Sequence, residues 1–107
     1  MRKVTIITGS DFDAVGNIIS PQTRSDAIET VEVVAGNQFG GISYVDSHGS
    51  WKDGKGEIVR ENGITFTLFT DASDSSIQAF ARYVKNVFRQ NSVVLSVSDG
   101  ESVQFIE

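Results

Sequence analysis

The spacing of apolar and polar positions along the chain predicts alternating strands and helices. Lys3–Thr8 (KVTIIT) is apolar at successive positions and β-branched, which is typical of a strand covered on both faces. Residues 11–20 have no clear period and predict a loop. Apolar residues then recur at helical spacing, with Ser20 as N-cap, Pro21 at the first helical position and Gly36 as the expected stop.

A second helix has the clearest pattern in the chain. Ser75 and Gln78 fit a capping box, and Asp71 and Asp74 lie near the positive end of the helix dipole. Apolar residues on one side of this helix form a continuous face: Ile77, Phe80, Ala81, Val84, Val87 and Phe88. Such a face predicts that the helix packs against a sheet.

Two signals compete for the turn of the central hairpin: the glycine-rich Lys52–Gly56 segment and Asn62-Gly63. A hairpin centred on Gly54 gives a consistent face by pairing Ile42 with Phe66, Tyr44 with Ile64 and Ser50 with Ile58. The alternative register places apolar residues opposite polar ones. We therefore predict a turn at Lys52–Gly56 and a bulge or bend at Asn62-Gly63. At roughly 3.3 Å per residue the strands outrun a small sheet, so Ser47–Arg60 should form a projecting arm.

A last hairpin is predicted around Ser98–Gly100. A two-residue loop would set Leu95 opposite the polar Gln104, whereas a three-residue loop sets Leu95 opposite Val103. The three-residue loop makes one face uniformly apolar, so we predict that register, with Gly100 as the left-handed residue of a bulge.

The predicted order is strand, helix, strand, strand, helix, strand, with one further strand. This is the split β-α-β order of ferredoxin-like folds. It predicts a two-layer α+β sandwich with both helices on one face of an antiparallel sheet. At 107 residues, the chain is expected to be one domain. The expected core comprises Val4, Ile6, Ile64, Phe66, Leu68, Ile77, Phe80, Val84, Phe88, Val93 and Leu95.

Composition narrows the expected partners and compartment. The net charge of −5 argues against nucleic acid and anionic membranes as partners. With no cysteine, the chain has no disulfides, thiol nucleophiles or thiolate metal ligands. Nothing at the N-terminus resembles a signal peptide and no stretch approaches membrane-spanning length, so a cytoplasmic protein is expected.

Three segments carry a resemblance: FGGISYVDSHGSW, GEIVRE and RQNSVVLSV, between Phe39 and Val97. They resemble small α+β proteins of bacteria and bacteriophages, in which a Gly-x-Trp hairpin, a following Glu and a late Gln recur. The resemblance implies no catalytic residue; it touches Gly40, Gly49, Trp51, Gly56, Glu61 and Gln90. A fainter likeness is to the divalent-cation-tolerance and PII-like proteins, which share the chain order. The basic phosphate-contacting loop of the PII type is absent here.

The projecting arm carries the expected interaction residues: His48, Trp51, Lys52, Lys55 and Arg60. An indole near a glycine-rich tip can anchor a protein partner, stack on a base, or cover the edge of its own sheet. His48 has Asp46 two residues away and Arg60 as its expected cross-strand neighbour. A nearby guanidinium opposes imidazolium formation, so we expect a surface histidine rather than a catalytic one.

Other polar residues allow weaker hypotheses. The flank formed by Arg82, Lys85 and Arg89 could hold a phosphate, although a solvated helix face explains these cations more simply. Asp11 and Asp13 lack a third ligand, so no metal site is expected. Glu61 could act as an acid, but pairing with Arg60 or Lys52, or simple solvation, is the favoured interpretation.

These observations predict a non-enzymatic interaction module without a cofactor, which binds a protein partner or a second copy of itself through the arm. The alternative is an oligomeric PII-like sensor that binds a nucleotide, an anion or a divalent metal between subunits. A hydrolase that uses His48 and nearby carboxylates ranks last, because no nucleophile elbow accompanies the serine, histidine and aspartate residues.

Overall fold

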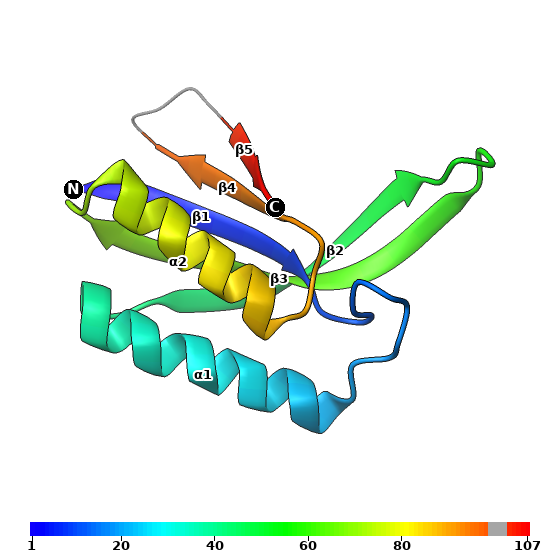
Figure 1. Ribbon diagram of the computed structural model, residues 1–107, viewed down its shortest axis with the longest axis horizontal. Helices are drawn as coiled ribbons and strands as arrows, with labels where there is room; N and C mark the ends of the chain where they lie inside the picture. Colours follow the sequence, from blue (N-terminus) through cyan, green and yellow to red (C-terminus); the bar gives the residue numbers. More distant parts are fainter. Residues whose placement is uncertain (99–102) are drawn as a thin grey trace.

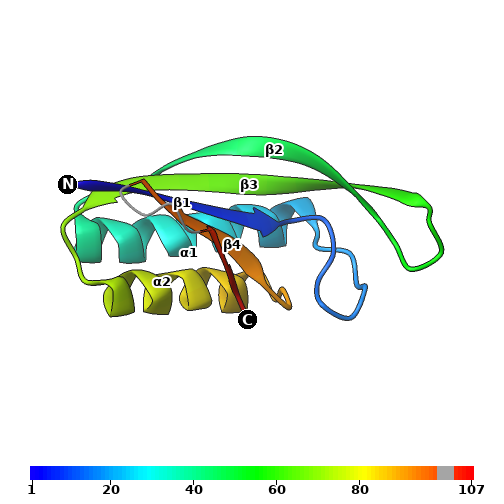
Figure 2. The same cartoon turned by 90° about the horizontal axis from the view of Figure 1, so that it is seen from above.

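Two helices cover one face of a five-stranded antiparallel sheet (Figures 1 and 2). The computed structural model describes residues 1–98 and 103–107. Its elements are β1 (Arg2–Gly9), α1 (Pro21–Phe39), β2 (Ser43–Lys52), β3 (Ile58–Thr70), α2 (Asp74–Val87), β4 (Val93–Val97) and β5 (Val103–Ile106). The sheet order is β2-β3-β1-β4-β5. The predicted two-layer α+β fold, with its additional C-terminal strand, is confirmed.

The core lies between the helices and the sheet. Every residue predicted for it is buried. Burial alternates along β1, where Val4, Ile6 and Thr8 are buried, whereas Ile7 is 41% exposed. The prediction of a first strand covered on both faces is therefore wrong, because both helices lie on the same side of the sheet (Figure 2).

Helix α1 begins where it was predicted but ends later. Ser20 Oγ accepts a hydrogen bond from the Thr23 amide at 3.1 Å, which confirms the cap. The predicted stop at Gly36 is wrong, because Gly36 lies inside the helix. Gly40 ends the helix instead: it adopts a φ of 89°, and its N–H donates to Gly36 O. A left-handed residue of this kind favours glycine and closes the last turn.

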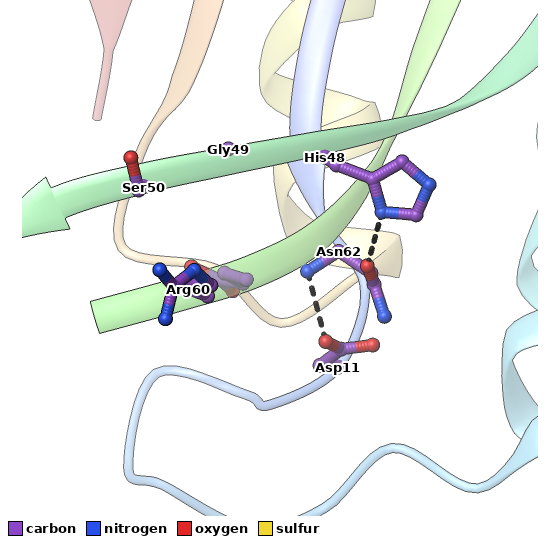
Figure 3. Close-up of a pocket in the computed structure, with 7 residues that line it drawn as sticks. Asp11, His48, Gly49, Ser50, Arg60 and Asn62 are labelled. Carbon is purple, nitrogen blue, oxygen red and sulfur yellow. Dashed lines mark hydrogen bonds between the residues drawn. The ribbon is translucent and has the colours of Figure 1, made fainter. Parts of the chain in front are cut away.

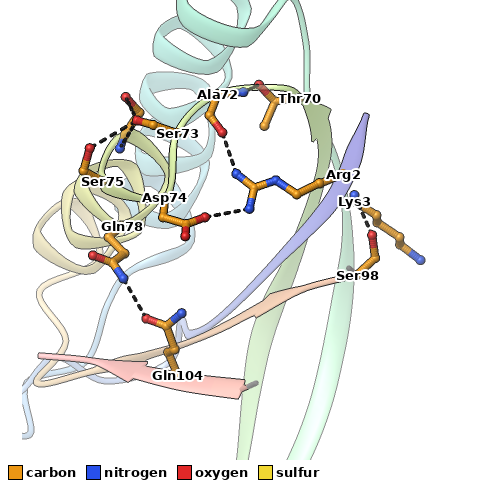
Figure 4. Close-up of polar contacts among 11 residues, drawn as sticks. Arg2, Lys3, Thr70, Ala72, Ser73, Asp74, Ser75, Gln78, Ser98 and Gln104 are labelled. Carbon is orange, nitrogen blue, oxygen red and sulfur yellow. Dashed lines mark hydrogen bonds and ion pairs between the residues drawn. The ribbon is translucent and has the colours of Figure 1, made fainter. Parts of the chain in front are cut away.

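Helix α2 is capped by Ser73 rather than by the predicted Ser75. Ser73 has extended backbone angles, and its hydroxyl accepts a hydrogen bond from the Ser76 amide at 3.2 Å. Ser75 already lies in the first turn, where its hydroxyl contacts that of Ser73 (Figure 4). Asp74 also lies in this first turn and forms an ion pair with Arg2 from β1, which joins helix and sheet.

The central hairpin turns in the predicted glycine-rich segment. Asp53 Oδ1 accepts hydrogen bonds from the Lys55 and Glu57 amides at 2.8 and 3.0 Å, and Gly56 has a φ of 80°. The observed register differs from the predicted one: Tyr44 lies opposite Phe66 rather than opposite Ile64. Because the displacement is by two residues, each side chain stays on its predicted face of the sheet.

Asn62-Gly63 continues strand β3 without the predicted bulge. Gly63 lies opposite Ser47 on one side and opposite Gly9 on the other. A Cβ atom on Gly63 would stand 2.5 Å from the Thr8 carbonyl oxygen, so close approach of the backbones explains this glycine. Strand β1 ends at Gly9, and beyond that point β2 and β3 run on as the projecting arm that was predicted (Figure 1).

The C-terminal hairpin has the register that the sequence interpretation rejected. Val93 lies opposite Ile106, and Leu95 lies opposite Gln104. Ile106 is buried, whereas Phe105 points to the other face and is 71% exposed. Gln104 is tolerated because its amide oxygen accepts a hydrogen bond from Gln78 of α2 at 3.0 Å (Figure 4). The bulge predicted at Gly100 lies outside the described residues.

Candidate functional site

A cavity of about 380 Å³ lies at the base of the arm, where β1 ends beside β3. Its lining comes from β2, β3 and the loop after β1 (Figure 3), and comprises Asp11, His48, Gly49, Ser50, Arg60, Glu61 and Asn62. The volume falls within the range of roughly 300–1,000 Å³ that is typical of small-molecule sites.

Hydrogen bonds fix the loop after β1 against strand β3. The backbone amide of Asn62 donates to Asp11 Oδ2 at 2.9 Å (Figure 3). The backbone amide of Ser10 donates to the Asn62 carbonyl at 3.2 Å. The side chain of Arg24 reaches from α1 to Ser10 Oγ at 3.3 Å and also pairs with Asp46. Asp11 is therefore held at the edge of the cavity directly by Asn62, and Arg24 holds the preceding residue, Ser10.

His48 contacts Asn62 across the hairpin, with 2.5 Å between Nδ1 and Oδ1 (Figure 3). Because a carbonyl oxygen can only accept, Nδ1 is the donor in this contact, and Nε2 takes no part in it. The predicted cross-strand neighbour of His48 is wrong, because Asn62 rather than Arg60 lies opposite it. Asp46 is paired with Arg24, and Arg60 lies opposite Ser50.

The surroundings of the Glu61 carboxyl group shift its pKa. Partial burial raises its pKa above the ordinary value of 4.5, and the nearby Asp11 carboxylate raises that pKa further. The Trp51 side chain, a hydrogen-bond donor near Glu61, lowers this pKa and opposes the first two effects. The favoured pairing of Glu61 with Arg60 or Lys52 is wrong: within residues 1–98 and 103–107 no ion pair involves Glu61.

The predicted interaction residues divide into two groups. His48 and Arg60 line the cavity, and Trp51, which is 53% exposed, reaches its edge through the contact with Glu61. Lys52 and Lys55 lie further toward the tip of the arm and take no part in the cavity lining.

The three cations proposed for anion contact lie elsewhere. Arg82 and Lys85 belong to α2, and Arg89 follows it with a left-handed φ of 54°. Arg89 lines a second cavity of about 140 Å³ beneath the loop of residues 11–19, together with Asp13. Anion binding by these residues stays a prediction.

Asp11 and Asp13 serve different contacts. Asp13 Oδ1 accepts hydrogen bonds from the Val15 and Asn17 amides, and the bond from Asn17 is the main reason why the pKa of Asp13 lies below its ordinary value. Across the part of the chain that the structure describes, no three histidine, aspartate or glutamate side chains are placed to hold a metal ion. None of its helices is long and apolar enough to cross a membrane.

Sequence reasoning gave too little weight to Asp11 and Glu61, and it missed Asn62. The useful signal was the pair of glycines, Gly9 and Gly63, which lie opposite each other where β1 ends. Asn62-Gly63 was interpreted as an irregularity within one strand, whereas it marks the place where a third strand and its loop approach closely.

Fold and cavity together define a two-layer α+β protein with an acidic site at the base of a β-arm. The chain belongs to the family described as "Protein of unknown function (DUF3574)", which matches residues 9–105. No curated protein matches the chain.

Two solved structures of a phage SAM lyase are similar to this chain along nearly its whole length. The structure in the apo state has 20% sequence identity and a TM-score of 0.69, over 98% of this chain and 87% of that one. The complex with S-methyl-5′-thioadenosine has 19% identity and a TM-score of 0.69, over 98% of this chain and 88% of that one. At this identity the likeness concerns the fold.

The prediction of a non-enzymatic interaction module is contradicted by this finding. The structures that share the architecture are those of an enzyme, and one of them holds a small nucleoside ligand. The absence of a familiar catalytic motif led to that prediction. The residues of this cavity come from segments far apart in the sequence, so they form no local motif that a sequence interpretation could detect. The alternative of a PII-like sensor gains no support either.

Proposed function

We propose that this protein is a lyase that acts on SAM, or on a closely related adenosyl sulfonium, in the cavity at the base of the arm. The observation that carries the proposal is the half-buried Glu61 carboxyl of raised pKa, which lies beside Asp11 in a cavity of ligand size. The resemblance in fold to a phage SAM lyase supports the choice of substrate.

The chemistry of a sulfonium suits this lining. When the bond between sulfur and the aminobutyrate chain of SAM breaks, both electrons of the bond stay on sulfur, which becomes the neutral thioether of S-methyl-5′-thioadenosine, and the carbon fragment is neutralised by the loss of a proton as its double bond forms. The Asp11 carboxylate at the cavity edge would attract the positive sulfur of the substrate. Glu61, with its raised pKa, is suited to exchange a proton near the reacting carbon fragment.

Trp51 and His48 fit the remaining parts of such a ligand. The exposed indole of Trp51 offers a flat apolar surface on which a purine can stack. His48 Nε2 is free to accept a hydrogen bond from a ribose hydroxyl, because Nδ1 is engaged by Asn62.

The test is incubation of the purified protein with SAM, followed by quantification of S-methyl-5′-thioadenosine by liquid chromatography and mass spectrometry. We expect product with the wild-type protein, and a rate about 10²- to 10⁴-fold lower for Glu61→Gln, the usual loss of a proton-transferring group. Glu57→Gln is the matched control, because Glu57 is exposed near the tip of the arm and outside the cavity lining.

Binding is tested separately by thermal shift with S-methyl-5′-thioadenosine, since a ligand of the native state raises the melting temperature. Absence of both product and shift would overturn the proposal. An equal loss of rate in the Glu61 and Glu57 variants would overturn the assignment of Glu61.

A further inference from the structure

Two side-chain oxygens converge over Gly9 at the end of β1. A Cβ atom on Gly9 would stand 2.5 Å from Glu61 Oε1 and 2.7 Å from Gln90 Oε1. Both distances are shorter than real Cβ contacts, so a Cβ atom at this position would displace the ends of these two flexible side chains. Since Gly9 has no positive φ, its backbone does not require glycine. The space that a side chain would occupy is instead filled by these two oxygens.

The amide of Gln90 is held in one orientation. Its Nε2 atom donates to the Phe12 carbonyl and to the Phe88 carbonyl, both at 2.8 Å, so both amide hydrogens are engaged. The Gln90 backbone amide donates to Lys85 O at 3.0 Å, which fixes the chain after α2. Gln90 Oε1 therefore has a set position, and no donor from the described residues contacts it.

The neighbours of Glu61 interact differently with its ionised and its protonated form. Trp51 offers the carboxyl group a donor, whereas Gln90 Oε1 is only an acceptor. An ionised carboxylate has no hydrogen to give to that oxygen, but a protonated carboxyl group does. A hydrogen bond made only by the neutral form favours that form.

We propose that Gly9 and Gln90 position the Glu61 carboxyl group to take up and hold a proton, with Gln90 Oε1 accepting the hydrogen of the protonated acid above Gly9. The inference rests on the proposed function for the role of that proton in turnover, but the contact itself is independent of any substrate. Gln90 is thus a positioning residue that acts through Glu61.

Other charged or titratable groups also face this carboxyl group. Asp11 comes from the loop after β1, His48 from β2 and Arg60 from β3, and all three line the cavity. On the side of α2, Arg89 lies near Asp13 and lines the second cavity. Gly9→Ala removes none of these groups and none of their hydrogen bonds, which makes it the selective probe, whereas Gln90 also holds the Phe12 carbonyl beside Asp11.

The test is a titration of the Glu61 side-chain carboxyl carbon by NMR, assigned by its loss in Glu61→Gln. Gly9→Ala deletes no polar group but adds a Cβ atom that displaces the two oxygens, so we expect the pKa of Glu61 to fall. Gly54→Ala is the control, because a Cβ there meets nothing within 4 Å, and it should leave the titration unchanged.

Two substitutions at Gln90 separate positioning from a general structural effect. Gln90→Met removes the acceptor and should lower the pKa of Glu61, whereas Gln90→Glu keeps an oxygen there, adds negative charge and should raise it. Shifts in the same direction for both variants, or no shift in Gly9→Ala, would overturn the proposal. If the shifts appear as expected but SAM is not converted, only the proposed function fails.

Discussion

At the scale of single residues, the site is built from contacts that no local pattern encodes. Asn62 and Asp11 are 51 positions apart, and Gln90 reaches Phe12 across 78 positions. Glu61 was considered as an acid from its type alone, and only its neighbours distinguish it from a solvated surface carboxylate. The residues of the arm could be predicted as a group, but their chemistry depends on what lies beneath them.

The raised pKa of Glu61 predicts a pH-dependent effect on stability. Because this pKa is higher in the folded protein than its ordinary value of 4.5, the folded state binds the proton more tightly than the unfolded chain does. Folding stability from this group is therefore full below the ordinary value and is lost as pH rises through the folded value. The glutamine of Glu61→Gln does not ionise, so this variant does not lose stability from this group as the pH rises.

Thermal melting between pH 4 and 8 measures the effect. We expect Glu61→Gln to gain stability relative to the wild type as pH rises through this window, while Glu57→Gln follows the wild type. A difference between Glu61→Gln and the wild type that does not change with pH would contradict the assigned cause.

At the scale of elements, patterns that depend on neighbouring residues predicted most of the fold. The apolar face of α2 and the turn at Lys52–Gly56 were found because each makes one consistent face. The sequence-based predictions were wrong where a residue distant in the sequence determines the strand register. The polar Gln104 can lie on the core side, opposite Leu95, because its amide oxygen accepts a hydrogen bond from Gln78 of α2.

Gly63 illustrates a backbone contact whose loss should be measurable. Gly63→Ala places a Cβ 2.5 Å from the Thr8 carbonyl oxygen, and backbone cannot move away as a side-chain end can. We expect a loss of about 1–3 kcal/mol in the free energy of unfolding, as for other overpacked positions. Chemical denaturation measures it, with Gly54→Ala as the control in open space. Equal stability of the two variants would show that β1 and β3 can separate at this point.

The packing of α2 on the sheet gives a third prediction. Phe80 is 3% exposed, and its ring meets that of Phe39 edge to face at 5.1 Å between centroids. Phe80→Ala should cost roughly 3–5 kcal/mol, the usual range for buried aromatic truncations. Phe69→Ala, at a position that is 56% exposed, should change stability by less than about 1 kcal/mol. An unchanged melting temperature for Phe80→Ala would contradict the assigned helix face.

At the scale of the whole molecule, no helix among the described residues covers the second side of the sheet (Figure 2). One cross-strand row runs through all five strands on that side: Val45, Thr65, Ile7, Val94 and Phe105. Three of its apolar members are well exposed, with Phe105 at 71% and Val45 at 63%. A row that is apolar at four of its five positions, with three of them exposed, is typical of an interaction surface.

Self-association stays a prediction of the sequence interpretation, and this row, rather than the tip of the arm, is the surface that we propose for it. Phe105→Ser should then shift the mass measured by sedimentation velocity toward the monomer, because a buried aromatic side chain contributes strongly to an interface. Val33→Ser is the control, since Val33 is 58% exposed on α1, away from the sheet. A wild-type protein that is monomeric at every concentration would contradict self-association. Equal dissociation in both variants would show that the interface does not depend on the row.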